Sequence, residues 1–262
     1  MARLSVSALL FCGAACMVLS SCSPRQLNIG KEEAPLPMVS QQWKEQNEWL
    51  EHQQDGDFFL YIQRFDRAEQ SFETAIKKAE DARFRDARLA RSQTGLARAY
   101  LNRHEFDDAL RLYTKALEIK KKAYGENHYD VADILTERAY ANLALFHTED
   151  ARSDVQQAKL IYRNLKSQSL PELDFVDAAL DVQSGNDRDA ETKFKSALQQ
   201  LLSQINLHHY PQPTKSMRIA RDCGDRYISI LEAHGKKSEA DSCRQNLKPI
   251  SEWLIILGET GV

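Results

Sequence analysis

The sequence predicts an all-α fold of stacked antiparallel helical hairpins, and three observations support this prediction. Among 262 residues, Gly (10) and Pro (7) are scarce, while the strong helix formers Ala, Leu, Glu, Lys, Arg and Gln are abundant. No segment shows the alternation of Val, Ile or Thr with polar residues that is typical of strands. Similar segments recur at intervals of roughly 40 residues, as they do in helical repeat proteins.

Four segments share one set of small and bulky residues. Each set has an alanine, a large or aliphatic residue four positions later, and a second alanine three positions after that. Because such positions lie on one face of a helix, each set predicts a stripe that packs against a neighbouring helix. A fifth, degenerate segment keeps only Ala240. The four sets are Ala68/Phe72/Ala75, Ala109/Tyr113/Ala116, Ala151/Val155/Ala158 and Ala190/Phe194/Ala197.

Another small residue stands twelve positions before each first alanine: Gly56, Ala97, Ala139 and Ala178. This spacing predicts the contact point on a preceding antiparallel helix. A single hairpin of this kind cannot bury its own apolar face, so several hairpins must stack to form a continuous core.

These segments resemble the tetratricopeptide repeat over roughly residues 49–247. The unit at residues 95–135, GLARAYLNRHEFDDALRLYTKALEIKKKAYGENHYDVADIL, matches best, and its YGENHYDVA turn is similar to repeats of the kinesin-light-chain type. The resemblance implies a right-handed solenoid over residues 46–248, with about five hairpins of which the last is degenerate.

The resemblance also implies that the first helices of the units line a concave groove that binds peptides. Arginines in such a groove can hold the carboxylates of an acidic or C-terminal peptide. The alternative is that these residues are ordinary solvated helix residues. The predicted peptide-binding residues are Tyr61, Arg91, Thr94, Arg98, Asn102, Asp133, Thr136 and Tyr140, with Asp57 beside them in the first unit.

The N-terminal segment has the layout of a secretory signal peptide over residues 1–21, with Arg3 followed by an apolar run at residues 8–19. The run is short for a membrane-spanning helix, which is the alternative. The residues LSSC resemble a bacterial lipobox, which implies that Cys22 becomes the acylated N-terminus. Because Ser follows Cys22, the periplasmic face of the outer membrane is favoured over the inner membrane.

Two segments flank the repeats. Residues 22–45 are polar and contain Pro24, Pro35 and Pro37, which predicts a lipidated N-terminus followed by a flexible linker. Residues 249–262 contain the apolar stretch EWLIILG. This stretch predicts a tail that caps the end of the stack, although an exposed docking element is an alternative.

No motif predicts catalysis, a metal site or a cofactor. His208 and His209 are adjacent in a predicted loop between hairpins, where a metal site would need further ligands. Cys223 and Cys243 lie on either side of a turn near Gly235, so they are predicted to form a disulfide in an oxidising compartment. Two buried free thiols are the alternative.

These features together predict a lipid-anchored scaffold of the bacterial envelope that binds a protein or peptide partner in the assembly of an envelope complex. The net charge of −3 argues against nucleic acid as a partner. A secreted binding protein without lipid is one alternative, and an envelope enzyme with a site at residues 203–222 is another. The sequence leaves the oligomeric state open.

Overall fold

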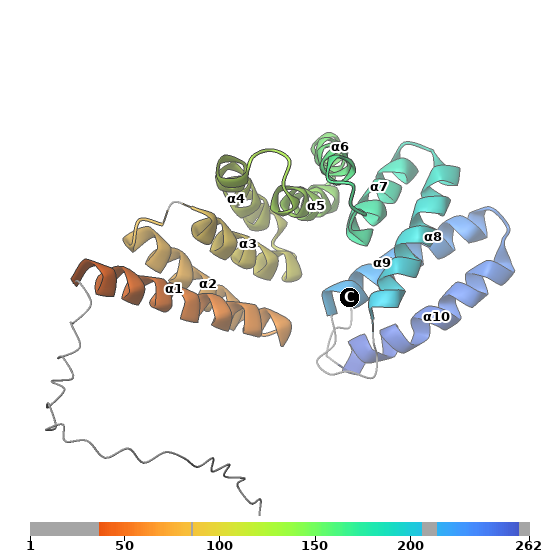
Figure 1. The fold of residues 1–262 in the computed structure, drawn as a ribbon. Helices are drawn as coiled ribbons and strands as arrows, with labels where there is room; N and C mark the ends of the chain where they lie inside the picture. The colour runs from red at the N-terminus through yellow and green to blue at the C-terminus, as the bar shows by residue number, and fades with distance from the viewer. Residues whose placement is uncertain (1–36, 85, 206–213, 257–262) are drawn as a thin grey trace, which may run out of the picture.

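The computed structural model describes residues 37–84, 86–205 and 214–256 (Figure 1). All regular secondary structure in these ranges is α-helical, which confirms the predicted fold class. The helices are α1 (Pro37–Tyr61), α2 (Phe65–Asp81), α3 (Ala87–Asn102), α4 (Phe106–Tyr124), α5 (Tyr129–Ala144), α6 (Thr148–Asn164), α7 (Pro171–Gln183), α8 (Asp187–Gln204), α9 (Thr214–Ala233) and α10 (Lys237–Ile256).

Consecutive helices pair into five antiparallel hairpins, α1–α2 to α9–α10, which stack along a curved array (Figure 1). The second helix of each hairpin also packs against the first helix of the next, most extensively at α2–α3, α4–α5 and α8–α9. Each helix is therefore held by neighbours that are close in sequence, as expected for a repeat array.

The predicted stripes form the core of the array. The alanines and bulky residues of all four sets are buried, including Val155, which replaces an aromatic residue in the third set. The small residues on the preceding helices, Ala97, Ala139 and Ala178, are fully buried as well. The regular spacing in the sequence thus corresponds to regular packing between the layers.

Phe72 shows why one of these positions is glycine. A Cβ placed on Gly56 of α1 would lie 2.5 Å from the Phe72 ring, and a Cβ on Gly95 of α3 would lie equally close. The ring therefore fills the space between α1 and α3, and any side chain at either glycine would collide with it.

The five hairpin turns share one backbone geometry. Each contains a residue with positive φ: Gln63, His104, Phe146, Gly185 or Gly235. The next residue donates its backbone N–H to the carbonyl five positions earlier, as in Arg64 to Phe59 (2.8 Å) and Lys236 to Leu231 (2.8 Å). This is the Schellman arrangement, which satisfies the last carbonyls of a helix and reverses the chain.

The ends of the array differ from the predicted boundaries. Helix α1 begins at Pro37, inside the segment assigned to the linker, because proline is tolerated in the first turn of a helix. Helix α10 continues through Pro249 to Ile256, since Ile250 and Leu254 on its inner face are buried against the core. The described part of the tail therefore extends the last helix and closes the stack.

Several predictions fall outside the described residues. These are the signal peptide (1–21), the lipidated Cys22, the pair His208 and His209, and the last residues of the tail (257–262). Among the described helices, none is both long enough and apolar enough to span a bilayer.

Candidate functional site

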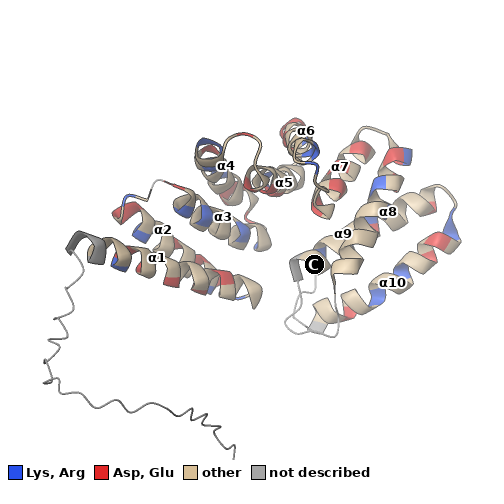
Figure 2. Ribbon diagram, in the orientation of Figure 1, with Lys and Arg blue, Asp and Glu red and all other residues tan. Residues whose placement is uncertain are grey.

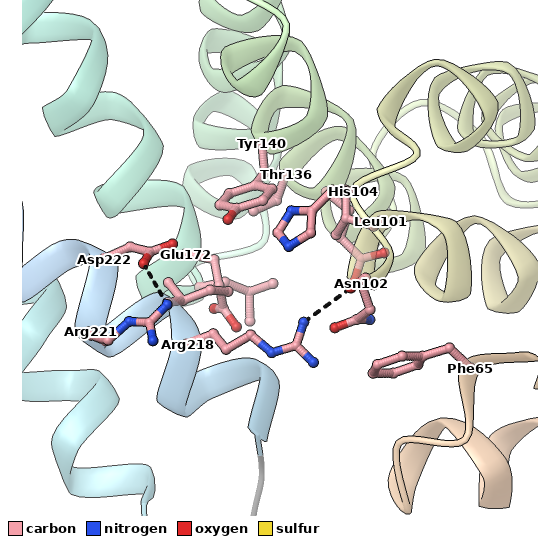
Figure 3. Close-up of a pocket in the computed structure, with 13 residues that line it drawn as sticks. Phe65, Leu101, Asn102, His104, Thr136, Tyr140, Glu172, Arg218, Arg221 and Asp222 are labelled. Carbon is pink, nitrogen blue, oxygen red and sulfur yellow. Dashed lines mark hydrogen bonds and ion pairs between the residues drawn. The ribbon is translucent and has the colours of Figure 1, made fainter. Parts of the chain in front are cut away.

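A pocket lies where the first helices of four hairpins, α3, α5, α7 and α9, meet the start of α2 and the turn after α3 (Figure 3). Its walls are largely apolar and come from the start of α2, the end of α3, α5, the start of α7, and α9. The enclosed space is about 220 Å³, somewhat smaller than the roughly 300–1,000 Å³ of pockets that hold drug-sized ligands. The apolar lining consists of Phe65, Leu101, Tyr140, Leu170 and Ile219.

Arg218 joins distant parts of the chain at this pocket. Its Nη1 donates to the backbone carbonyl of Asn102 (3.3 Å), and its guanidinium lies 5.4 Å from the centroid of the Phe65 ring (Figure 3). Asn102 ends α3, where carbonyls lack a partner within the helix and the helix dipole favours a cation. The curvature of the array thus brings α9 to the turns of the first two hairpins, beside Phe65 at the start of α2 and Asn102 at the end of α3.

The polar rim of the pocket mixes both signs of charge. Arg221 and Asp222 form a loose ion pair (3.7 Å), and Glu172 contributes a second carboxylate from α7. Burial raises the pKa of the Asp222 carboxyl, against the opposing effect of Arg221 and Arg226. Burial, and then the nearby Asp222, raises the pKa of Tyr140 to about 12, so its phenol is neutral at physiological pH.

A second, polar hollow lies beside the first, between α1, α3, the end of α4 and α5. Its charges are paired within the protein. Arg91 donates to Asp57 (2.8 Å), and Lys120 donates to Asp130 (2.5 Å). Asp133 accepts a hydrogen bond from the Tyr162 hydroxyl (2.7 Å), and burial raises the pKa of this carboxyl.

The structure distributes the predicted groove residues over these two hollows. Arg91, Thr94, Arg98 and Asp133 line the polar hollow, and Asn102, Thr136 and Tyr140 line the central pocket. Tyr61 lines neither of them and is exposed at the end of α1. The hydroxyls of Thr94 and Thr136 donate to carbonyls one turn earlier in their own helices, at 2.8 and 2.9 Å.

Arg91 and Arg98, the two arginines predicted to bind a peptide, already form ion pairs within the protein. Arg98 Nε donates to both carboxylate oxygens of Glu137, at 2.9 and 3.0 Å. The buried Glu137 raises the pKa of Arg98, while burial opposes this effect. A carboxylate ligand at Arg91 or Arg98 would therefore have to compete with Asp57 or Glu137, which sequence spacing alone could not reveal.

The sequence reasoning missed Phe65, Glu172, Arg218, Arg221 and Asp222 as pocket residues. Phe65 follows a hairpin turn, and the α9 residues belong to the unit that keeps only Ala240 of the repeat pattern. Nothing in the local sequence indicates that α9 lines the groove, because the position of α9 depends on the curvature of the whole array.

The two cysteines lie on α9 and α10, the helices of the last hairpin, as predicted. In the structure Cys223 and Cys243 are buried free thiols, and Cys223 Sγ lies 3.5 Å from the Phe194 carbonyl oxygen. Burial raises the pKa of both thiols. The disulfide stays a prediction, and alkylation of the denatured, unreduced protein would test it. Within the described ranges, no group of three His, Cys, Asp or Glu is placed to hold a metal ion.

Comparison with known proteins identifies the repeats. Residues 56–122 and 88–164 match the family model of the tetratricopeptide repeat. Residues 56–164 are therefore tetratricopeptide repeats, as their sequence pattern predicts. A comparison with curated proteins found no match.

Solved structures share the fold at low sequence identity. BtubC (BKLC) from P. vanneervenii is 19% identical, with 84% of this chain and 92% of that chain covered and a TM-score of 0.52. A Rap protein complexed with competence and sporulation factor is 13% identical, with 77% and 63% covered and a TM-score of 0.53. The apo form of RapI is 14% identical, with 79% and 82% covered and a TM-score of 0.56.

Proposed function

We propose that this protein is a lipid-anchored scaffold of the bacterial envelope that binds a protein or peptide segment in its central pocket. The tetratricopeptide repeats at residues 56–164 support a protein-binding role. The Rap protein that shares the fold is complexed with competence and sporulation factor. The partner of the present protein is proposed to belong to an assembly in the cell envelope.

The observation that carries the proposal is the composition of the central pocket. Phe65, Leu101 and Ile219 offer apolar surface on which a partner side chain can be desolvated. Glu172 and Arg221 at the rim can pair with charged groups of either sign on a flanking segment. An apolar floor with a charged rim is the usual arrangement of a site that holds an exposed peptide side chain.

The paired charges favour binding over catalysis. Glu137 is held by Arg98 (2.9 Å), and Asp222 lies beside Arg221 (3.7 Å). Arg98 occupies both carboxylate oxygens of Glu137, so this carboxylate is not placed to take a proton from a molecule in the pocket. The pocket therefore supports recognition through shape, apolar contact and charge.

The proposed anchor rests on the sequence of the first 22 residues. Acylation of Cys22 with more than one chain would hold the protein stably, since each buried methylene contributes about 0.8 kcal/mol and one chain alone binds marginally. The outer membrane remains the favoured location because Ser23 follows the cysteine.

A crosslinked pull-down from envelopes tests the pocket. Phe65→Glu and Tyr140→Glu place a charge on its apolar lining, and we expect partners captured by the wild type to be lost. Tyr124→Glu is the matched control, because Tyr124 is an exposed aromatic residue outside the pocket. An unchanged set of partners in the pocket variants, with their helical content intact, would overturn the proposed site.

A separate experiment tests the anchor. Cys22→Ala removes the acylated thiol, and we expect the protein to leave the membrane fraction while its circular dichroism spectrum stays helical. Mass spectrometry of the wild type should show an acylated N-terminus at Cys22. A mature chain that begins elsewhere would favour the secreted protein without lipid.

A further inference from the structure

The outer face of α1 carries an uncharged stripe with exposed aromatic residues. The stripe consists of Trp43, Asn47, Leu50, Gln54 and Phe58, spaced three or four residues apart and therefore on one face of the helix. Trp43 is 68% exposed and Phe58 is 56% exposed, while Leu50 is partly buried against the core. We call these five residues the α1 stripe.

The α1 stripe occupies the position at which the other units pack together. In α3, Gly95 faces Phe72 of the preceding helix α2, and Ala99 is buried in the same cluster. Ala68 and Ala109 occupy the same position in consecutive repeats. Moving back from Gly95 and Ala99 by the same interval gives the corresponding positions in α1, which are Gln54 and Phe58. Helix α1 packs against α2 and, to a lesser degree, α3, and no described hairpin precedes it (Figure 1).

The two ends of the array differ in polarity. At the C-terminal end, α10 carries charged residues of both signs (Figure 2). Its exposed positions include Lys237, Asp241, Arg244 and Lys248. A polar outer face is what keeps the terminal repeat of an array soluble. The α1 stripe lacks charge and exposes two aromatic side chains, Trp43 and Phe58. Aromatic residues are enriched and charged residues are depleted at protein interfaces.

Shape and charge identify the chemistry of the occupant. Phe58 protrudes where α3 has Ala99, so a helix seated here must present a small side chain opposite Phe58. Glu51 and Asp55 flank the stripe, are exposed, and form no ion pair within the described residues. Neighbouring carboxylates are already used, since Glu48 pairs with Lys78 (2.7 Å) and Asp57 with Arg91 (2.8 Å). The exposed Lys44 lies beside the N-terminal part of the stripe, 3.9 Å from Glu48. The unpaired charge beside the C-terminal part, next to Phe58, is therefore negative.

We propose that the α1 stripe docks an amphipathic helix of a partner protein, with a small residue against Phe58 and lysine or arginine beside Glu51 and Asp55. The docked helix would take the place of the second helix of a preceding hairpin. A second copy of this chain fits less well, because antiparallel pairing of two α1 helices about residue 53 would place Glu51 of one copy against Asp55 of the other, and like charges at an interface are unfavourable. An anionic lipid surface would be repelled by the same two groups.

Two synthetic peptides test this proposal. Both are helix-forming and share an Ala and Leu face, but one has lysine and the other glutamate beside that face. Fluorescence anisotropy of the labelled peptides with the purified protein should show that the lysine peptide binds at least about tenfold more tightly. Phe58→Lys should weaken its binding about tenfold or more. Glu51→Lys/Asp55→Lys should reverse the preference.

The control is Phe146→Lys, which changes an aromatic residue that is 81% exposed but outside the α1 stripe. It should bind both peptides as the wild type does. Equal affinity for the two peptides, or no binding of either at about 1 mM, would overturn the proposal. Dimerisation that Phe58→Lys abolishes would assign the surface to a second copy, and binding of phosphatidylglycerol vesicles that it abolishes would assign it to lipid. Either result would also overturn the proposal.

Discussion

Phe72 connects three helices through a single side chain. Its ring lies between Gly56 and Gly95, so the distance between α1 and α3 is set by the thickness of one aromatic ring. The repeat pattern located Phe72 and Gly56 in the sequence. It did not identify Gly95 as the second contact, because Gly95 lies outside the set of small residues that recurs in every unit.

We expect Gly95→Ala to destabilise the protein by about 1–3 kcal/mol, because its Cβ would collide with a fully buried ring. The better helix propensity of alanine, about 1 kcal/mol, offsets only part of this loss. Urea unfolding of both proteins measures the difference. The control is Asp55→Ala at an exposed position of α1, and equal stability of Gly95→Ala and the wild type would contradict the packing described above.

Glu191 links the last two hairpins through Lys236 (2.5 Å) and His234 (2.9 Å). The hydrogen bond from Lys236, followed by that from His234, lowers the pKa of Glu191. Because its folded-state pKa lies below the unfolded value, Glu191 stabilises the fold above the unfolded pKa. This contribution is lost as the pH falls through the folded pKa.

The replacement Glu191→Gln should therefore lower the free energy of unfolding by about 0.5–1 kcal/mol at pH 7. The difference from the wild type should shrink as the pH is lowered from about 5 to 3. Denaturant unfolding at a series of pH values measures this difference. A difference that stays constant over this range would show that the ion pair is not its cause.

At the scale of the helical elements, the turns were less predictable than the helices. The stripes of alanine and bulky residues follow from short-range periodicity, which the sequence displays directly. The turns of the first three hairpins instead place Gln63, His104 and Phe146 at positive φ, where glycine is usual. Helix α10 runs through Pro249, because burial of Ile250 and Leu254 outweighs the loss of one hydrogen bond.

We expect Phe146→Gly to stabilise the protein by about 0.5–1 kcal/mol. Phe146 has a φ of 61° and its side chain is 81% exposed, so the change relieves backbone strain and removes little packing. Thermal unfolding measures the gain. Gly185→Ala, at the equivalent position of another turn, should have the opposite effect, and destabilisation by Phe146→Gly would reveal a contact of its ring.

At the scale of the whole molecule, the central pocket exists because the array curves. Arg218 meets Asn102 and Phe65 across most of the length of the chain. The resemblance to the tetratricopeptide repeat implies which residues face the inside of the curve, and three of them, Asn102, Thr136 and Tyr140, line the pocket. It does not predict how far the curve closes, because that depends on small rotations accumulated over successive hairpins.

The contact of Arg218 should hold α9 near the first two hairpins. In Arg218→Ala, spin labels at Asp66→Cys and Asp225→Cys should show a broader distance distribution than in the same double-labelled protein with Arg218 intact. Both labelled positions are exposed, so the labels should not disturb the core. An identical distribution would mean that the curvature is fixed by packing between neighbouring hairpins alone.

The most direct test of the account is site-specific photocrosslinking in living cells. Benzoylphenylalanine in place of Tyr140 puts the reactive group in the central pocket, and in place of Tyr124 it puts the group at an exposed site outside the pocket. We expect a discrete crosslinked protein from position 140 that is absent from position 124. No crosslinked partner at position 140, or the same products at both positions, would contradict the binding role of the pocket.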